Sequence, residues 1–115
     1  MTLKEFYDSI GGDYEDAVTR FRMEPLVQKF VLRFPEDTSF AELKAALEAD
    51  ETEKAFGAAH TLKGVAANLS LAELTKSASE VTEHLRAGNL EEGKAGFPPV
   101  EAAYEAAIAA IEKLG

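Results

Sequence analysis

The sequence predicts an all-α protein, an antiparallel four-helix bundle with an additional short N-terminal helix. Residues that favour helices, chiefly Ala, Leu, Glu and Lys, dominate the chain, and apolar residues recur three and four positions apart. No segment alternates apolar and polar residues as a strand does, and no Asn-Gly or Asp-Gly hairpin turn occurs. Helices of this kind, joined by short turns, pack as an antiparallel bundle.

The N-terminal third predicts three short helices. The first is expected over residues 2–10 and ends at Gly11-Gly12, because glycine favours a helix C-terminus. Asp13 can cap a second segment that runs through Phe21. Pro25 suits the first turn of a third helix, which stops before Pro35.

The next three helices begin at capping sequences, in which Ser or Asp is followed three residues later by Glu. These pairs are Ser39 with Glu42, Asp50 with Glu53, and Ser70 with Glu73. They predict helices over residues 40–49, from 50 to about 68, and from 70 to about 86. Gly88 is placed to end the last of these.

The C-terminal stretch, from residue 90 to 114, also has a helical pattern. Gly96, Pro98 and Pro99 are expected to break or kink it, which leaves residues 100–114 as the secure helix. No internal repeat, low-complexity tract or linker interrupts the chain, so residues 1–115 are expected to form a single domain.

Charge and composition exclude several classes of function. The formal net charge of -9 repels phosphate backbones and anionic lipid, so we expect neither nucleic acid nor membrane as a partner. The chain has no cysteine, which excludes disulfides and thiolate metal sites. Residues 1–10 lack the apolar core of a signal peptide, and no apolar run is long enough to span a membrane. A cytoplasmic protein is expected.

The segment from residue 54 to 69 places one histidine on the outer face of its helix. At roughly 100° per residue, the small and apolar residues lie within roughly 60° of Leu62. They are Ala55, Ala58, Ala59, Val65, Ala66 and Leu69. His60 lies roughly 160° from Leu62 on the same count, so its imidazole should face solvent.

The predicted surroundings of His60 are unusual for an exposed helix face, which normally carries charged side chains. Its neighbours on adjacent turns are Phe56, Gly57, Lys63, Gly64 and Ala67. Each mid-helix glycine costs roughly 1 kcal/mol relative to alanine. Gly64 stands where a side chain would crowd the imidazole, and Phe56 is expected to be a docking contact outside the core.

Other chemistry has little support in the sequence. A single helical histidine without further ligands at suitable spacing does not make a zinc site, so no metal is expected. Neither a serine-nucleophile motif nor a cysteine accompanies it. His84 lies near a helix C-terminus, where a positive charge is favourable, and is assigned no role.

One motif resembles a known family. The string His60-Thr61-Leu62-Lys63-Gly64, followed by small residues up to Leu69, resembles the signature of histidine-containing phosphotransfer (HPt) domains. The resemblance extends over residues 13–113. Two departures are Ser70, where the family has glycine, and the Gly96-Phe97-Pro98-Pro99 run, which interrupts a usually longer final helix.

The resemblance implies a function for each residue of the motif. His60 would be phosphorylated, Lys63 would stabilise the phosphoryl group, and Gly64 would leave room around the ring. Residues that would contact a docked partner are Phe56, Gly57, Gly64, Ala67 and Asn68. The partners implied are the receiver domain of a response regulator and a hybrid sensor histidine kinase. The chain would need no cofactor of its own, because the receiver supplies magnesium.

The sequence therefore predicts a monomeric phosphocarrier of two-component phosphorelays, without independent catalytic activity. Histidine suits this task because its neutral imidazole is available as a nucleophile near neutral pH. The alternative is a helical adaptor, which binds a partner through the same exposed face and never carries phosphate.

Overall fold

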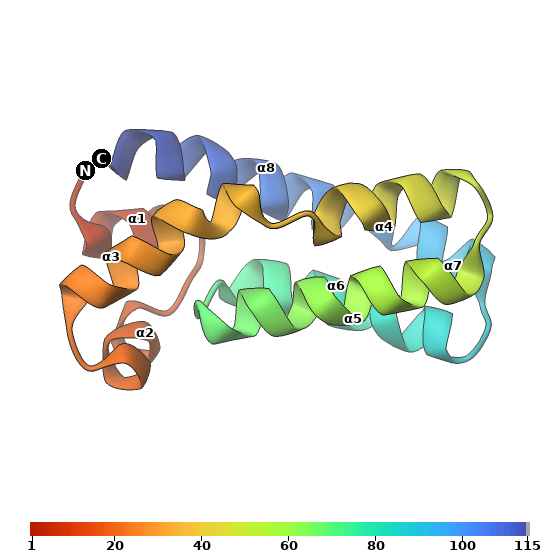
Figure 1. Ribbon diagram of the computed structural model, residues 1–115, viewed down its shortest axis with the longest axis horizontal. Coiled ribbons are helices and arrows are strands. Elements are labelled where there is room, and N and C mark those ends of the chain that lie inside the picture. The colour runs from red at the N-terminus through yellow and green to blue at the C-terminus, as the bar shows by residue number, and fades with distance from the viewer. Residues whose placement is uncertain (115) are drawn as a thin grey trace.

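The computed structural model describes residues 1–114, which form an all-helical bundle (Figure 1). Three helices near the N-terminus are followed by a short 3-10 turn and five further helices. The N-terminal elements are α1 (Leu3–Ser9), α2 (Tyr14–Phe21), α3 (Glu24–Arg33) and η1 (Phe34–Glu36). The others are α4 (Ser39–Glu48), α5 (Thr52–Asn68), α6 (Ala72–Arg86), α7 (Leu90–Ala95) and α8 (Phe97–Leu114). The predicted all-α helical bundle is confirmed.

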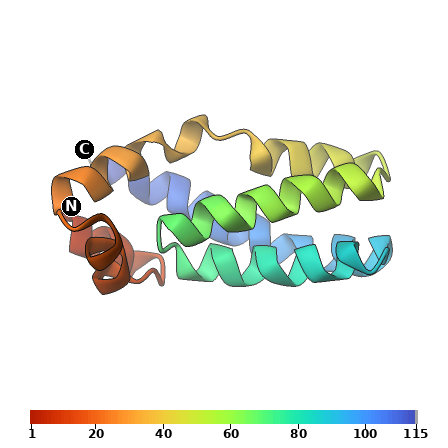
Figure 2. The same ribbon diagram turned by 60° about the horizontal axis from the view of Figure 1, so that its bottom comes forward.

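Helix α5 occupies a central place in the packing. It contacts α4 on one side and α6 on the other, and α6 in turn packs against α8. Short turns join α4 to α5 and α5 to α6, so each chain segment folds back beside the previous one (Figure 2). No helix in the described part of the chain combines the length and the apolar character that a membrane span needs.

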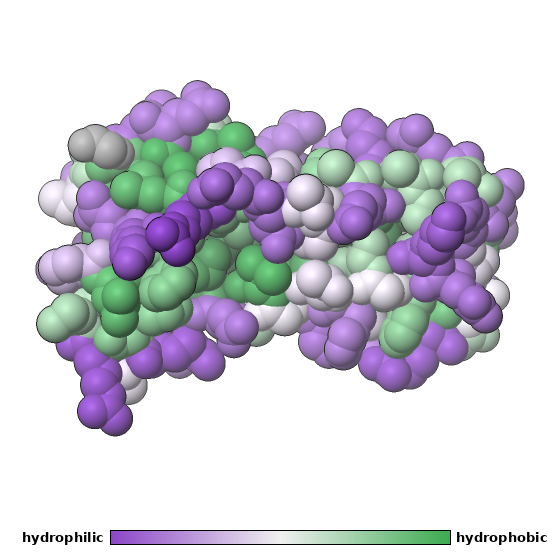
Figure 3. Space-filling model, in the orientation of Figure 1, coloured by the Kyte–Doolittle hydropathy of each residue, from purple (hydrophilic) through white to green (hydrophobic). Residues whose placement is uncertain are grey.

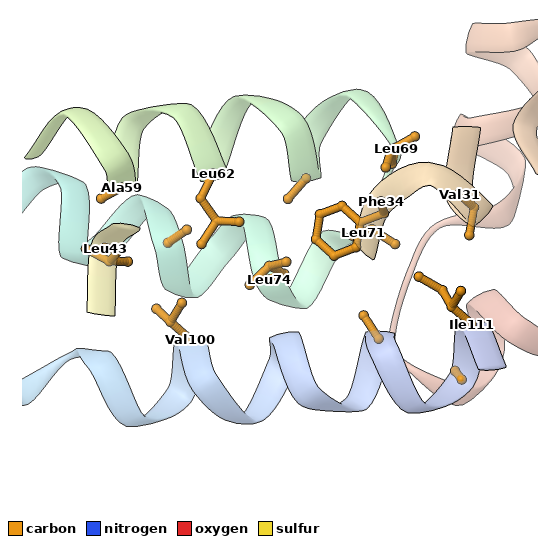
Figure 4. Packing of buried hydrophobic residues seen from close by; sticks show 14 of the residues in the cluster. Val31, Phe34, Leu43, Ala59, Leu62, Leu69, Leu71, Leu74, Val100 and Ile111 are labelled. Atoms are coloured by element: carbon orange, nitrogen blue, oxygen red, sulfur yellow. The ribbon is translucent and has the colours of Figure 1, made fainter. Parts of the chain in front are cut away.

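The core forms where α4, α5, α6 and α8 face one another. Leu43, Leu62, Leu74 and Val100, one from each of these helices, point toward a common interior (Figure 4). On α5 the other buried residues of the helix are alanines, and alanine lets a neighbouring helix approach closely. The predicted inward direction of Leu62 is confirmed, since its side chain is fully buried.

The N-terminal helices cover one end of the bundle, where α5 turns into α6 (Figure 1). Tyr7 of α1 is fully buried, and its hydroxyl donates a 2.6 Å hydrogen bond to the carbonyl of Leu69. The backbone N–H of Asp13 donates to the carbonyl of Ser70 at 3.0 Å. These bonds satisfy polar groups of the buried turn at the C-terminus of α5.

Several helix starts agree with the sequence. The Asp13 carboxylate accepts from the N–H of Asp16 at α2, as predicted. At α1, Thr2 and Glu5 form a complete capping box that was not predicted, because Thr2 was expected inside the helix. Pro25 lies in the first turn of α3, as predicted. Each of these caps uses residues three apart or closer, which explains why local sequence is sufficient to find them.

The three capping pairs predicted further along are wrong. Ser39 is the first residue of α4, and the N-cap residue before it, Thr38, makes no side-chain cap bond. Both the backbone N–H of Ser39, at 2.9 Å, and its hydroxyl donate to the Asp37 carboxylate. Asp50 lies outside α5 with a positive φ of 57°, and α5 has no side-chain cap either.

At the third predicted pair, Ser70 also has φ 57°, and its hydroxyl donates to Asp16 of α2 at 2.6 Å. The helix that follows begins with Leu71 as its N-cap residue and has no side-chain cap. The N-cap position of α6 thus belongs to Leu71, while Ser70, in the left-handed region, lies before it and donates its hydroxyl to a distant helix.

The predicted break in the C-terminal stretch is confirmed at Gly96, which separates α7 from α8. The secure helix is longer than expected, however, and starts at Phe97 instead of residue 100. Pro98 and Pro99 lie in the first turn of α8, where the N–H groups that proline lacks have no partner within the helix.

Candidate functional site

His60 lies midway along α5 and is exposed to solvent. Leu62, two residues later, is fully buried, so the two side chains leave the helix on opposite sides. No side-chain hydrogen bond or ion pair involves His60 within residues 1–114. The predicted outward direction of the imidazole agrees with this geometry. A partner protein can therefore approach the ring from outside the bundle.

The imidazole is flanked on one side by Phe56, one turn earlier on α5. The two ring centroids are 6.0 Å apart and the rings are inclined by 20°, which is a stacked arrangement. Phe56 is half-buried and packs against the core cluster. The sequence predicted a docking contact outside the core. This prediction is only partly met, since Phe56 packs against the core cluster and also stacks on the exposed imidazole.

The remaining neighbours of His60 leave open space. A Cβ atom added at Gly57 or Gly64 would meet no atom within 4 Å, apart from adjacent residues and the backbone of α5 itself. This differs from the expectation at Gly64, because an alanine there would not touch the imidazole of the free protein. Neither glycine is required by the fold, although both lower the helical propensity of α5.

Lys63 is the cation closest to His60 along α5, three residues away on the adjacent turn. Its side chain is half-buried and forms no ion pair within residues 1–114. In contrast, Lys54 near the start of the same helix pairs with Glu51 at 2.8 Å. The Lys63 ammonium group is thus available to an anion that arrives from outside.

The other predicted contact residues lie toward the C-terminus of α5. Ala67 is half-buried and Asn68 is exposed. His60 and Asn68 are eight positions apart, which corresponds to roughly 12 Å along a helix axis. The structure therefore places the predicted residues on one continuous face of α5, which runs from Phe56 to Asn68 and includes His60.

Asn68 also borders a groove of about 890 Å³, whose apolar lining includes Phe21, Phe30 and Phe34. The groove lies where α2 and α3 approach the end of α5. In Figure 3 the strongest apolar colour lies in the half of the face that contains the N-terminal helices and the C-terminal end of α8, whereas paler, more polar surface covers the half that contains the start of α5.

One residue near the site was missed by the sequence analysis. The guanidinium carbon of Arg86, in the last turn of α6, lies 5.1 Å from the centroid of the Phe56 ring. The sequence contains no signal for this contact, because the two residues are on different helices and thirty positions apart. Only the packing of α5 against α6 brings them together.

Within residues 1–114, no group of three or more His, Asp and Glu side chains is arranged to hold a metal ion. Glu53 is the one acidic residue of α5 and lies seven positions before His60. The central part of α5 thus offers a nucleophilic ring and a cation, without an adjacent carboxylate on its own helix.

A family model, that of the Hpt domain, matches residues 25–113 of the chain. The match includes the whole of α5 and all seven residues predicted for the site. Neither the search of curated proteins nor that of solved structures gives a match.

Proposed function

The chain belongs to the Hpt domain family, whose model matches most of its length, and from this membership we propose that it is a phosphocarrier with His60 as its phosphorylated residue. The family implies histidine phosphotransfer in phosphorelays, and its members are generally carriers without catalytic activity of their own. The observation that carries the assignment to His60 is the exposure of its ring midway along α5, beside open space at Gly64.

The proposed reaction is a reversible transfer between His60 and an aspartate of a receiver domain. The lone pair of a neutral ring nitrogen attacks phosphorus and forms a P–N bond. The bond between phosphorus and the aspartate oxygen breaks at the same time, and the carboxylate leaves with the electron pair. The other ring nitrogen keeps its proton. Donation to a receiver is the reverse of this step.

Phosphoryl transfer depends mainly on positioning and on stabilisation of negative charge. On the His60 face, Lys63 is the side chain that we propose for the second task, because its ammonium group has no carboxylate partner within residues 1–114. We assign the remaining stabilisation to the partner, whose acidic site would bring Mg²⁺. The carrier would then need no cofactor of its own.

We propose that the receiver docks over the exposed face of α5. Gly57, Gly64, Ala67 and Asn68 would form the floor of the interface, with Phe56 at its edge. Small residues suit this position because they let the receiver bring its aspartate close to a ring that projects from the helix. A hybrid sensor histidine kinase would be the upstream source of phosphate, and a monomer in the cytoplasm is sufficient for this exchange.

The proposal is tested by charging a purified receiver domain with acetyl phosphate and incubating it with the protein. We expect an acid-labile, alkali-stable label on the wild type and none on His60→Gln. His84→Gln is the matched control, because it removes the other histidine of the chain and should keep the label. Circular dichroism checks that both variants fold.

A label that persists in His60→Gln would refute the assignment. A receiver that binds the wild type but never labels it would favour the adaptor function instead.

A further inference from the structure

Three side chains from two helices form a contact chain that ends at His60. The ring of Phe56 stacks on the imidazole with centroids 6.0 Å apart, and the guanidinium carbon of Arg86 lies 5.1 Å from the Phe56 centroid. Both distances fall in the range of attractive aromatic and cation–π contacts. We call this set, Arg86, Phe56 and His60, the aromatic stack.

The Phe56 ring is held more firmly than the imidazole. It is half-buried and packs against the core cluster, while Arg86 approaches it from the last turn of α6. Arg86 is itself held by Glu83, whose carboxylate lies 3.3 Å from the guanidinium Nε. Phe56 is therefore restrained by two helices, whereas His60 is exposed.

The imidazole has few other restraints. Within the described residues no side-chain hydrogen bond or ion pair involves His60, and the space at Gly57 and Gly64 is open. An exposed side chain without such partners samples several rotamers, and fixing one of them lowers its entropy. Within the described residues, the contact with Phe56 is thus the interaction that can favour a single orientation of the ring.

We infer that Phe56 is a positioning residue for His60 and that Arg86 holds Phe56 in place, an inference that rests on the proposed phosphocarrier function. The near-parallel Phe56 ring flanks the imidazole, and no side-chain hydrogen bond within the described residues occupies the ring nitrogens, which stay available to the partner. A ring that is already oriented needs less reorganisation in the transition state, so the stack acts on the rate of transfer.

The inference predicts a particular signature for Phe56→Leu, which keeps an apolar side chain but removes the aromatic ring. We expect the maximal transfer rate, kcat, to fall about three- to tenfold, while KM for the phosphorylated receiver rises by less, because Phe56 lies only at the edge of the proposed interface. Phe56→Tyr keeps the ring and should restore the rate. Arg86→Gln should lower kcat in the same direction but less, and Arg86→Lys should recover part of it.

Proton NMR of the two histidine rings provides a readout that needs no phosphate. The Phe56 ring current should shift the His60 ring protons, and Phe56→Leu should remove that shift while Phe56→Tyr retains it. The signals of His84 serve as an internal control for Phe56→Leu, and the His84→Gln variant assigns the two sets.

Three results would overturn the inference. The first is that the His60 signals stay in place in Phe56→Leu. The second is that kcat is unchanged and only KM rises, which would make Phe56 a docking contact without a positioning role. The third is that Arg86→Gln, an exposed substitution that avoids any loss of core packing, changes neither kcat nor the His60 signals. A failure of the proposed phosphocarrier function would give another result. The wild type would then take no phosphoryl label, while the chemical shifts of the His60 ring protons would still show the contact with Phe56.

Discussion

Replacing Gly64 with alanine should make the protein more stable and, at the same time, a worse phosphocarrier. The position lies in the interior of α5, and a Cβ atom added there meets nothing within 4 Å beyond its own helix backbone and adjacent residues. The substitution therefore gains helical propensity without steric cost, and we expect about 1 kcal/mol of added stability. For a chain of 115 residues this corresponds to a rise in Tm of roughly 4 °C.

The same reasoning applies to Gly57, where the space is equally open. The two glycines are seven residues apart, or roughly 10 Å along the helix, so their effects should be nearly additive. The double variant should gain about 2 kcal/mol. Thermal unfolding and urea titration measure these gains, and an unchanged urea m-value would confirm that the unfolding transition is the same.

Gly93 of α7 provides the matched control, since the same substitution should have the opposite effect there. Its added Cβ would lie 2.6 Å from a methyl carbon of Leu85, which is buried, so Gly93→Ala should lower Tm.

Phosphotransfer to Gly64→Ala from a charged receiver should fall by roughly tenfold or more, because the added methyl group keeps the partner's aspartate away from the ring. If Gly64→Ala gains stability and transfers at the wild-type rate, the idea that this glycine makes room for a partner is refuted. If it gains no stability, the account of α5 as open at this position fails.

Three further substitutions test other parts of the structure. Lys63→Ala should slow phosphotransfer on the order of tenfold without changing the circular dichroism spectrum, and an unchanged rate would show that Lys63 is only a surface residue. Tyr7→Phe removes the hydrogen bond to the Leu69 carbonyl and should lower the free energy of unfolding by about 1–2 kcal/mol in urea titrations. Burial raises the pKa of Tyr7, because the folded protein favours the neutral phenol. The contribution of this group to the free energy of unfolding is therefore complete below the ordinary tyrosine pKa of about 10 and is lost as the pH rises above it. Tyr7→Phe should reduce this loss of stability at alkaline pH. The hydroxyl of Ser70, and then Arg20, lower the pKa of Asp16. The contribution of this carboxylate to the free energy of unfolding is therefore present at neutral pH and is lost as the pH falls. Asp16→Asn should make the free energy of unfolding depend less on pH in the acid range.

The sequence by itself determined the helices and the outward direction of His60. Both depend on local rules, because the periodicity of an α-helix fixes which residues share a face once the helix is formed. The position of Leu62 in the core and of His60 outside it follows from that periodicity alone. The predicted cap at Asp13 was also local, since it joins residues that are three positions apart.

The tertiary structure decided which partners the polar and aromatic side chains take. Ser70 has the spacing of a cap but bonds Asp16, because the fold brings the carboxylate of α2 to the start of α6. Phe56 could be placed on the outer face from the sequence, yet its contact with Arg86 depends on how α5 packs against α6. Such contacts join residues that are far apart in the chain, and the free energies that select them arise only when the helices are packed.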